Sequence, residues 1–484
     1  MTEVKIGLET HVQLDTETKL FCGCPNQDCE EPNQNVCETC LGHPGSKPRL
    51  NKAVLNQCVK AAEALNCDIN DNVFFSRKTY FYPDMSKNYQ ITQYEVPVAE
   101  NGRKKVNVSD REKAVEIKRL HIEEDPAKTQ HKGGNISDSD YTKVDYNRAG
   151  TPLIEIVTEP DFESAEEARA YLQQMVQMLE YLDLYKPESN YSIKTDANIS
   201  IEGGNRVEVK NITGTSEVEK ALNYEISRQK QLKKRGREVE QETRTFNSDI
   251  SATETLRQKE TEEDYGYIFD PDLTRQELNT ELQERIRESL PELPQEKLKR
   301  FKKEYNLEDK LVESLIKDSK MAEDFENLSE SLNTGLVASW MTGEIRKVLN
   351  YNELTYSDSN LSREFIEELL TMIQKDEVSD RNAEKLLRHK ASLDDQDTDI
   401  DKLEMDGEDL GPRVIAEEND LLKADKDEMD AFVEAAIEEN PEPVQDYKSG
   451  DDEALNFIVG QVMQRSNGKA DPKTAREKIL KNID

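Results

Sequence analysis

The feature that most limits how this chain can fold is a change in the spacing of its apolar residues near residue 290. Before that point, segments such as VKIGLETHVQL (residues 4–14) and SIKTDANISI (residues 192–201) alternate apolar and polar residues. This alternation is typical of strands with one buried face. After it, segments such as SREFIEELLTMIQK carry apolar residues at helical spacing. The sequence therefore predicts an α+β fold, with an N-terminal α/β region followed by helices.

A chain of 484 residues is too long for one hydrophobic core, so we expect several domains. The first twenty residues carry charges throughout, and no segment approaches the roughly 18 apolar residues that span a bilayer. We therefore expect a cytoplasmic protein without a membrane partner. We place an α/β domain at 1–290, an all-helical domain at 291–390, an acidic linker at 391–410 and a small helical tail domain at 411–484.

Five of the seven cysteines lie between residues 20 and 40. Four of them form a C-x-C pair and a C-x-x-C pair, and twelve residues separate the pairs. Thiols stay reduced in the cytosol, so paired thiols across a short loop favour a tetrahedral zinc site over a disulfide. The alternative is a loop with unrelated thiols. We predict a structural zinc in a loop over 20–42, bound by Cys22, Cys24, Cys37 and Cys40, with Cys29 left free.

The charge balance is strongly acidic, with 101 acidic against 65 basic residues and a formal net charge of -36. A nucleic-acid-binding protein usually carries a basic face, so this balance argues against such a partner unless the chain is adapted to high salt. Acidic residues occur in nearly every segment, which favours the halophilic interpretation. The most basic stretch, RQKQLKKRGR, closes a predicted helix. It suits either a helix C-terminus or a phosphate contact, and the sequence leaves both open.

The outward faces of four predicted strands carry acids, amides and lysines. A solvated sheet face explains any one of these strands, but the recurrence over four of them favours a functional site. The chain contains neither a GxxxxGK[ST] phosphate-binding loop nor a GxGxxG turn, so a nucleotide site must be built in another way. The outward residues are Lys5, Glu9, His11, Gln13, Glu155, Lys194, Asp196, Asn198, Arg206, Glu208 and Lys210.

Eight motifs, distributed in order along essentially the whole chain, are familiar from one protein family. They are IGLETHVQL (6–14), RKTYFYPDMSKNYQITQY (77–94), HIEEDPAK (121–128), NRAGTPLIEIVTEPDF (147–162), DANISI (196–201), VEVKN (207–211), QETR (241–244) and NGKADP (467–472). Together they closely resemble the B-subunit family of the glutamyl/aspartyl-tRNA amidotransferases. The resemblance implies a cradle-like α/β domain, a helical domain and a tRNA-binding tail. The cysteine pairs resemble the zinc loop that some family members carry in the cradle.

The resemblance also implies a reaction. A tRNA carries Asp or Glu where Asn or Gln is needed, and the B subunit uses ATP to phosphorylate the side-chain carboxylate. Ammonia, which the amidase (A) subunit releases from glutamine, then displaces the phosphate. The implied partners are the amidase (A) subunit, a small (C) subunit of the same heterotrimer and the mischarged tRNA, whereas DNA is not expected. This chain lacks the Gly/Ser-rich segment of an amidase, which agrees with the division of labour.

The implied cofactors are ATP, Mg²⁺ and Zn²⁺, and the motifs assign residues to them. The implied magnesium ligands are His11, Glu124 and Glu155, with Glu123 adjacent to Glu124 and not distinguished from it. Glu9 shares the strand face of His11, and these four residues form the expected catalytic set. We expect weaker contacts to nucleotide or acyl phosphate from Lys78, Lys87, Arg148 and Lys210, and tRNA contacts from Arg465, Lys469, Lys473 and Arg476.

Two alternatives compete with this assignment. The related protein of the archaeal Glu-tRNA-only amidotransferase carries an inserted domain before the tail, and this chain is too short to contain it. A non-catalytic zinc-containing tRNA-binding or scaffold protein would be favoured by loss of Glu9, His11 or Glu155, and all three are present. The choice between Asp-tRNA(Asn) and Glu-tRNA(Gln) is left open by the sequence.

Overall fold

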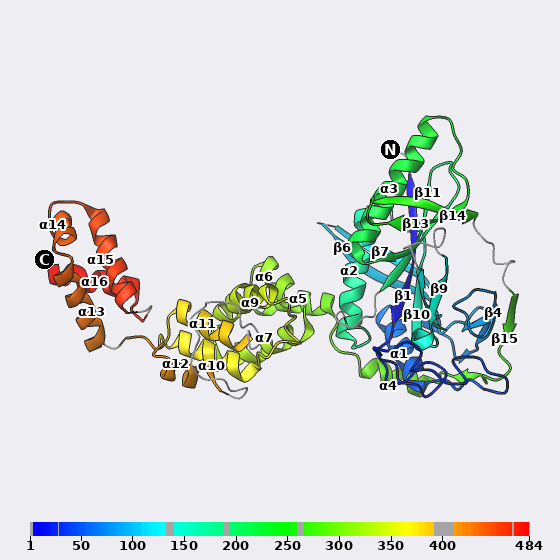
Figure 1. The fold of residues 1–484 in the computed structure, drawn as a ribbon, viewed down its shortest axis with the longest axis horizontal. Coiled ribbons are helices and arrows are strands. Elements are labelled where there is room, and N and C mark those ends of the chain that lie inside the picture. Colours follow the sequence, from blue (N-terminus) through cyan, green and yellow to red (C-terminus); the bar gives the residue numbers. More distant parts are fainter. Residues whose placement is uncertain are drawn as a thin grey trace. The chain divides into compact units, whose positions relative to one another are not determined.

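The computed structural model describes residues 3–27, 29–109, 111–131, 140–186, 193–258, 266–391, 410–424, 426–466 and 469–483. The chain divides into two compact units, Met1–Leu293 and Pro294–Asp484 (Figure 1). The first unit is built around a large sheet and the second is helical, so the predicted α+β class is confirmed. The expected acidic linker, 391–410, lies almost entirely outside the described residues.

A nine-stranded sheet forms the centre of the first unit, with β1 in its middle. All neighbouring strands pair antiparallel except β12 and β13, which are parallel and joined through a helix. In sheet order the strands are β14 (Ala252–Gln258), β13 (Glu242–Asn247), β12 (Val207–Thr213), β11 (Lys194–Ile201), β1 (Val4–Gln13), β10 (Pro152–Thr158), β7 (Arg111–Glu124), β6 (Ala99–Val108) and β2 (Asp68–Ile69).

Smaller elements surround this sheet. A three-stranded sheet consists of β15 (Gly266–Phe269), β4 (Ser76–Thr79) and β5 (Tyr89–Thr92). Two strands, β16 (Gln276–Glu277) and β3 (Asn72–Val73), form one two-stranded sheet. A second two-stranded sheet pairs β8 (Lys128–His131) with β9 (Thr142–Asp145). The helices are α1 (Lys52–Ala64), the short 3₁₀ helix η1 (Tyr146–Arg148), α2 (Ala165–Tyr181), α3 (Thr215–Lys234) and α4 (Thr280–Glu288).

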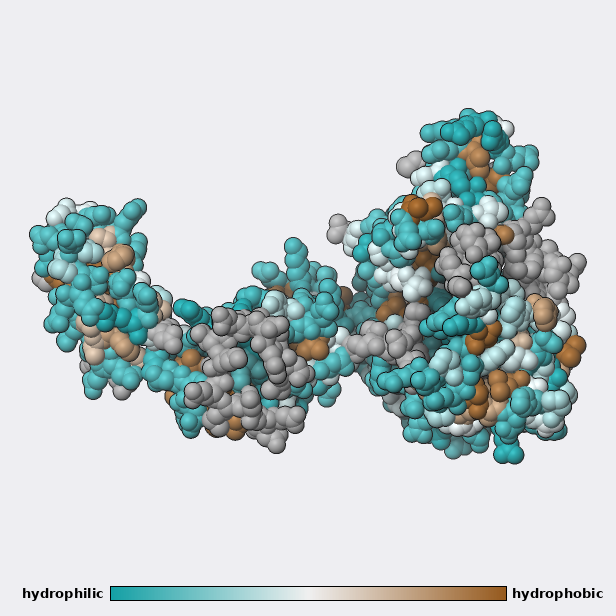
Figure 2. All heavy atoms as spheres, in the orientation of Figure 1, coloured by the Kyte–Doolittle hydropathy of each residue, from teal (hydrophilic) through white to brown (hydrophobic). Residues whose placement is uncertain are grey.

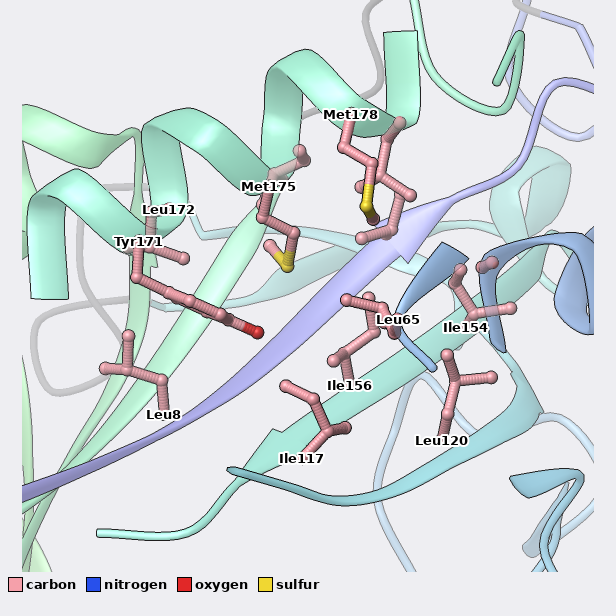
Figure 3. Packing of buried hydrophobic residues seen from close by; sticks show 14 of the residues in the cluster. Leu8, Leu65, Ile117, Leu120, Ile154, Ile156, Tyr171, Leu172, Met175 and Met178 are labelled. Atoms are coloured by element: carbon pink, nitrogen blue, oxygen red, sulfur yellow. The ribbon is translucent and has the colours of Figure 1, made fainter. Parts of the chain in front are cut away.

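The hydrophobic core of the first unit lies between one face of the large sheet and its helices. Leu8 of β1 and Ile156 of β10 are almost fully buried, and they belong to the same cluster as Tyr171 and Met175 of α2 (Figure 3). Successive side chains of a strand point to opposite faces. The residues between these apolar ones, including Glu9, His11 and Glu155, are therefore presented on the other face of the sheet.

The helices α2 and α3 of the first unit begin in different ways. Ser164 caps α2, since its hydroxyl accepts a hydrogen bond from the backbone N–H of Glu167 at 3.2 Å. Ser216 does not cap α3, because this helix already begins at Thr215 and Gly214 occupies the cap position with a φ of 86°. A positive φ of this size favours glycine. The start of α3 is therefore set by the backbone turn at Gly214 and not by a side-chain hydroxyl.

The second unit contains two hydrophobic clusters. The larger one joins α5 (Pro294–Glu304), α6 (Asp309–Leu315), α7 (Ser319–Ser331), α8 (Thr334–Trp340), the π-helical turn η3 (Met341–Ile345), α9 (Arg346–Tyr351), α10 (Arg363–Gln374), α11 (Asp380–Ala391) and α12 (Pro412–Glu418). The smaller one joins α13 (Lys426–Glu439), α14 (Pro441–Lys448), α15 (Asp452–Arg465) and α16 (Pro472–Ile483). Because α12 buries Ile415 and Ala416 in the larger cluster, the separate tail bundle begins near Lys426.

The surface agrees with the acidic composition. On the face drawn in Figure 2, hydrophilic residues cover most of each unit and the hydrophobic ones are scattered. Exposed large apolar side chains do occur, for example Phe81, Ile268 and Phe269. Among the described residues, no helix combines the length and the apolar character needed to cross a membrane.

Candidate functional site

Four neighbouring strands of the large sheet place polar residues in one row. His11 of β1 lies opposite Glu155 of β10, and Glu155 lies opposite His121 of β7. On the other side of β1, His11 lies opposite Lys194 of β11. Residues directly opposite on paired strands point to the same face, with Cβ atoms about 5 Å apart. The row of these four side chains therefore crosses the middle of the sheet, on the face turned away from the core.

Three side chains at this row converge like the ligands of a cation. The Nε2 atom of His11 lies 3.5 Å from Glu123 Oε1 and 3.5 Å from Glu155 Oε2. One ligand atom from each of the three residues lies within 4.8 Å of the others. Carboxylate oxygens are the ligands that Mg²⁺ and Mn²⁺ prefer, whereas imidazole is typical of metals such as Zn²⁺ and Fe²⁺. The two carboxylates thus fit the divalent cation that the family resemblance implies, with His11 as a third donor.

The electrostatics of the three groups agree with a site for positive charge. Burial alone would lower the pKa of His11, but Glu155 and Glu123 raise it to about 10. Burial and the charge of Glu155 raise the pKa of Glu123. Burial would also raise the pKa of Glu155, but His121 and His11 outweigh it and hold the pKa well below its usual range. Two crowded carboxylates repel each other, and a cation between them relieves that repulsion.

Glu124, which the sequence suggested as a ligand, is placed elsewhere. Its carboxylate accepts hydrogen bonds from Lys87 Nζ and, at 2.8 Å, from the backbone N–H of Ile91. Adjacent residues of a strand point to opposite faces, so Glu123 and Glu124 cannot both join the row. The structure brings Glu123, and not Glu124, into the cluster of ligand atoms.

A second acidic cluster adjoins the first through Glu9. Ligand atoms of Glu9, Asp196 and Glu208 lie within 4.8 Å of one another. Lys210 Nζ lies 2.9 Å from Asp196 and 3.6 Å from Glu208, and these carboxylates raise its pKa despite its burial. Asn198 donates a hydrogen bond to Glu9 at 2.8 Å, while burial and neighbouring acids raise the pKa of Glu9. Lys210 is therefore held by carboxylates in this structure.

The other predicted cations also lie near the row. Arg148, at the end of η1, donates to the carboxylate of Asp125. Lys78 of β4 lowers the pKa of Glu123 through its charge, although burial of Glu123 has the larger, opposite effect. Lys194 is mostly buried, and this burial lowers its pKa. The polar face thus combines carboxylates with several cationic groups, which is the composition that a phosphoryl-transfer site needs.

The four predicted zinc ligands meet in the loop that follows β1. The Sγ atoms of Cys22, Cys24, Cys37 and Cys40 lie within 4.8 Å of one another, and those of Cys37 and Cys40 are 3.9 Å apart. Tetrahedral zinc with Zn–S distances of about 2.3 Å places its sulfur atoms about 3.8 Å apart. The loop therefore fits zinc, and Cys29 lies outside the cluster, hydrogen-bonded to Gln34.

A buried lysine supports the cysteine cluster. Lys19 is 1% exposed, and its Nζ donates to the backbone oxygen of Asn35 at 2.6 Å and lies 4.0 Å from Cys40 Sγ. A hydrogen bond from Cys22 lowers the pKa of Cys40 to about 5, and the charge of Lys19 acts in the same direction. Zinc binds the thiolate form of cysteine. The contacts of Cys40 with Cys22 and Lys19 thus favour the form that zinc binds.

The four predicted tRNA contacts differ in accessibility. Lys469 is 8% exposed and forms an ion pair with Asp420, and Arg465 forms one with Glu439. The other two are exposed on α16: Lys473, and Arg476, which donates to the side chain of Asn456 at 3.1 Å. Lys473 and Arg476 are therefore the better placed of the four for contact with a partner.

Sequence reasoning placed Lys194 and Asp196 on the polar face without a specific role, assigned no role to His121 and did not choose Glu123. A signal for two of them was present: Leu120 and Ile122 are buried, so strand alternation directs His121 and Glu123 to the polar face. No local signal could align His121 with Glu155. That alignment depends on the pairing of strands from distant parts of the chain.

Comparisons with known proteins show which family the chain resembles. Residues 4–284 match the family described as the GatB/GatE catalytic domain, and residues 323–483 match the family described as the GatB domain. The B subunit of the aspartyl/glutamyl-tRNA(Asn/Gln) amidotransferase of Haloquadratum walsbyi is 41% identical over 96% of this chain and 94% of the relative. The protein of the same name from Methanothermobacter thermautotrophicus is 42% identical over 99% of this chain and 100% of the relative. The one from Methanopyrus kandleri is 40% identical over 100% of this chain and 99% of the relative. The chain therefore belongs to the B-subunit family of the aspartyl/glutamyl-tRNA amidotransferases.

Proposed function

We propose that this chain activates the side-chain carboxylate of Asp or Glu on a mischarged tRNA, as the B subunit of a tRNA-dependent amidotransferase. The observation that carries the proposal is the cluster of His11, Glu123 and Glu155 in the middle of a polar sheet face. Membership of the family supports the substrate class, because the names of the relatives specify Asp- and Glu-tRNA amidation. Three of the motifs that the resemblance rests on, IGLETHVQL, HIEEDPAK and NRAGTPLIEIVTEPDF, contribute the three residues of this cluster.

The proposed reaction has two steps. The γ-phosphoryl group of ATP is transferred to the carboxylate, which yields ADP and an acyl phosphate. Ammonia then attacks the acyl carbon, phosphate leaves with the electrons of the C–O bond, and the attacking nitrogen loses a proton. Magnesium held by His11, Glu123 and Glu155 would supply charge neutralisation for the phosphates. Lys194, opposite His11, and Lys78, whose charge acts on Glu123, would orient the negatively charged groups.

The second acidic cluster has a different part in this proposal. Glu9 and its neighbours hold Lys210 beside the row, and Arg148 is held by Asp125. Fixed cations contribute to catalysis because they need no reorganisation when charge develops on the substrate. We propose that Lys210, Arg148 and Lys87 are positioned in this way by their carboxylate partners, and that Glu9 takes part through Lys210.

The remaining assignments complete the proposal. Zinc bound by the cysteine cluster braces the loop after β1, and it leaves no position open for water. Ammonia comes from the amidase (A) subunit, a small (C) subunit completes the complex, and the tail bundle contacts the tRNA. The complex acts in the cytoplasm at high salt.

The test is the substitution Glu155→Gln, which keeps the size of the side chain but removes its charge. We expect loss of ATP-dependent amidation in the assembled complex, with tRNA affinity and zinc content close to those of the unchanged protein. Glutamine hydrolysis by the amidase should continue. The matched control is Glu202→Gln, at an exposed position at the end of β11, which should leave amidation unchanged.

Normal amidation by the Glu155→Gln variant would show that the cation site lies elsewhere. The competing function is a tRNA-binding scaffold without catalysis. That alternative predicts that the complex consumes no ATP when mischarged tRNA is supplied, so ATP consumption measured with the unchanged protein separates the two.

A further inference from the structure

His121 stands out on the polar face because the sequence motifs assign it no role. It belongs to β7 and lies directly opposite Glu155 of β10. Its Nε2 atom is 3.2 Å from Glu155 Oε2, the same oxygen that lies 3.5 Å from His11 Nε2. The residue is only 7% exposed. A buried imidazole thus contacts one carboxylate oxygen of the proposed cation site.

The contact is indirect with respect to the cation. The ligand atoms that lie within 4.8 Å of one another come from His11, Glu123 and Glu155, and His121 is not among them. His121 therefore contacts the cluster through Glu155, from the side opposite to His11. This is the arrangement of a residue that orients a ligand, and not that of a further ligand.

The hydrogen-bonding state of His121 follows from its two nitrogen atoms. Its Nδ1 atom is buried and has no hydrogen-bond partner among the described residues. A proton on Nδ1 alone would leave a buried N–H without an acceptor and would point the Nε2 lone pair at a carboxylate oxygen. A proton on Nε2 instead donates to Glu155. Both observations select the form in which Nε2 is the donor.

We infer that His121 is a positioning residue that holds Glu155 in the orientation needed to bind the cation. Donation from Nε2 to Oε2 fixes the carboxylate against rotation and keeps this oxygen beside His11, 3.5 Å from its Nε2 atom. Hydrogen-bond partners of this kind typically change metal affinity about 10- to 100-fold when they are removed. This inference rests on the proposed cation site and extends it by one residue.

The test measures cation binding directly, without turnover. Mn²⁺ affinity of the full chain, measured by the electron paramagnetic resonance signal of free Mn²⁺, is compared for the unchanged protein and three variants. His121→Leu keeps the volume but removes the donor, and should weaken Mn²⁺ binding about 10- to 100-fold. His121→Gln places an amide N–H near the position of Nε2, and should restore binding close to that of the unchanged protein. Glu155→Gln removes the ligand itself and is the reference for a lost site.

The outcomes separate the inference from the function on which it rests. Mn²⁺ affinity of His121→Leu equal to that of the unchanged protein would overturn the positioning role. A His121→Gln variant as weak as Glu155→Gln would overturn it too, because it would make the imidazole a direct ligand. If Glu155→Gln binds Mn²⁺ like the unchanged protein, the cation site itself is wrong and the inference fails with it.

Folding is controlled separately. Zinc content and the thermal transition of each variant report whether the first unit is intact. If His121→Leu does not fold, His121→Asn replaces it, since its shorter side chain stays polar but withdraws the donor from Glu155. The same weakening of Mn²⁺ binding is expected of that variant, and unchanged affinity would overturn the inference.

Discussion

Single residues in this structure show how burial alone changes the behaviour of a charge. Lys104 of β6 is 9% exposed, and its Nζ lies 3.5 Å from the sulfur of Met178. The sulfur atom of a methionine is only a weak acceptor, so it compensates little of the lost hydration of an ammonium group. Burial lowers the pKa of Lys104 to about 8. This lysine therefore destabilises the fold at neutral pH.

The stability penalty at Lys104 can be tested through its pH dependence. The folded state binds fewer protons than the unfolded state between pH 8 and the ordinary lysine pKa of 10.5. The penalty is thus fully present below pH 8 and disappears as the pH rises toward 10.5. Lys104→Met should raise the free energy of unfolding by roughly 2–3 kcal/mol at pH 7, and by much less at pH 10.5.

The measurement is the thermal or urea-induced unfolding of the first unit at both pH values. The control is Lys105→Met, on the neighbouring position of β6, whose lysine is exposed and paired with Glu112. That variant should stay within about 0.5 kcal/mol of the unchanged protein. A gain for Lys104→Met that is equal at both pH values would contradict the assigned cause.

The cysteine cluster yields a second prediction at this scale. Elemental analysis should find about one zinc per chain, because four thiolates complete a structural site. Replacing Cys37 and Cys40 with Ser removes two of the four ligands and should abolish zinc binding. Cys29→Ser should retain zinc, since its thiol bonds to Gln34 outside the cluster. Zinc kept by the double variant would rule out this assignment.

Among the secondary structure elements, α2 and α3 give a comparison of two helix starts in one domain. The hydroxyl of Ser164 caps α2, and the glycine before α3 leaves its start without a side-chain cap. Loss of a serine cap typically costs about 1 kcal/mol. A local effect of that size is easily masked in the global unfolding of a chain with several cores, so a local probe is needed.

We predict that Ser164→Ala accelerates amide hydrogen exchange in the first turn of α2 about fivefold, which corresponds to about 1 kcal/mol. Ser216→Ala is the matched control, because Ser216 is exposed in the first turn of α3 and does not occupy its cap position. It should leave exchange in α3 unchanged. Equal effects of both substitutions would show that the hydroxyl of Ser164 does not act as a cap.

The elements also show how far the sequence could predict the site. Alternation identified β1, β10, β11 and β12 and the polar face that they share, since a strand's two faces are visible in its own residues. The order of the strands and their register were not visible, because β1 pairs with segments that lie far along the chain. Glu123 and Glu124 illustrate the limit. The family motif does not distinguish the two residues. Only the alternation of side chains along β7 directs Glu123 to the cation cluster and Glu124 to Lys87.

At the scale of the whole molecule, the acidic composition limits how the chain could bind its proposed tRNA partner. The net charge is -36, and two of the four cations proposed for the tail pair with carboxylates. Each phosphate contact makes an affinity more sensitive to salt. Binding by this chain should therefore depend on shape, stacking and hydrogen bonds more than on phosphate contacts.

We predict that tRNA binding persists at molar salt and that the tail bundle contributes to it. A chain ending at Lys423 keeps α12 and the contact of Lys423 with Glu377, and removes α13–α16. This truncation should lower tRNA affinity while the first unit stays folded and retains zinc. The measurement is tRNA affinity of both forms across a salt series.

Two results would contradict these expectations separately. Full-length binding that disappears well below molar salt would argue against the halophilic interpretation. Unchanged affinity after truncation would show that α13–α16 do not hold the tRNA. The substitutions Lys473→Ala and Arg476→Ala in the full chain test the two exposed cations of α16, and they should weaken binding less than the truncation does.

The central position of β1 has a consequence for how the protein is made. The ribosome produces this strand well before its two neighbours, β10 and β11, which begin only at Pro152 and Lys194. At about 5–20 residues per second, the nascent β1 waits roughly ten to forty seconds for them. During that time its apolar face is open to incorrect pairing. Lys5, Glu9 and His11 interrupt its apolar residues at alternate positions, and such charged or polar side chains oppose aggregation. Glu9 and His11, for which we propose a part in the reaction, would thus also protect the unfinished chain.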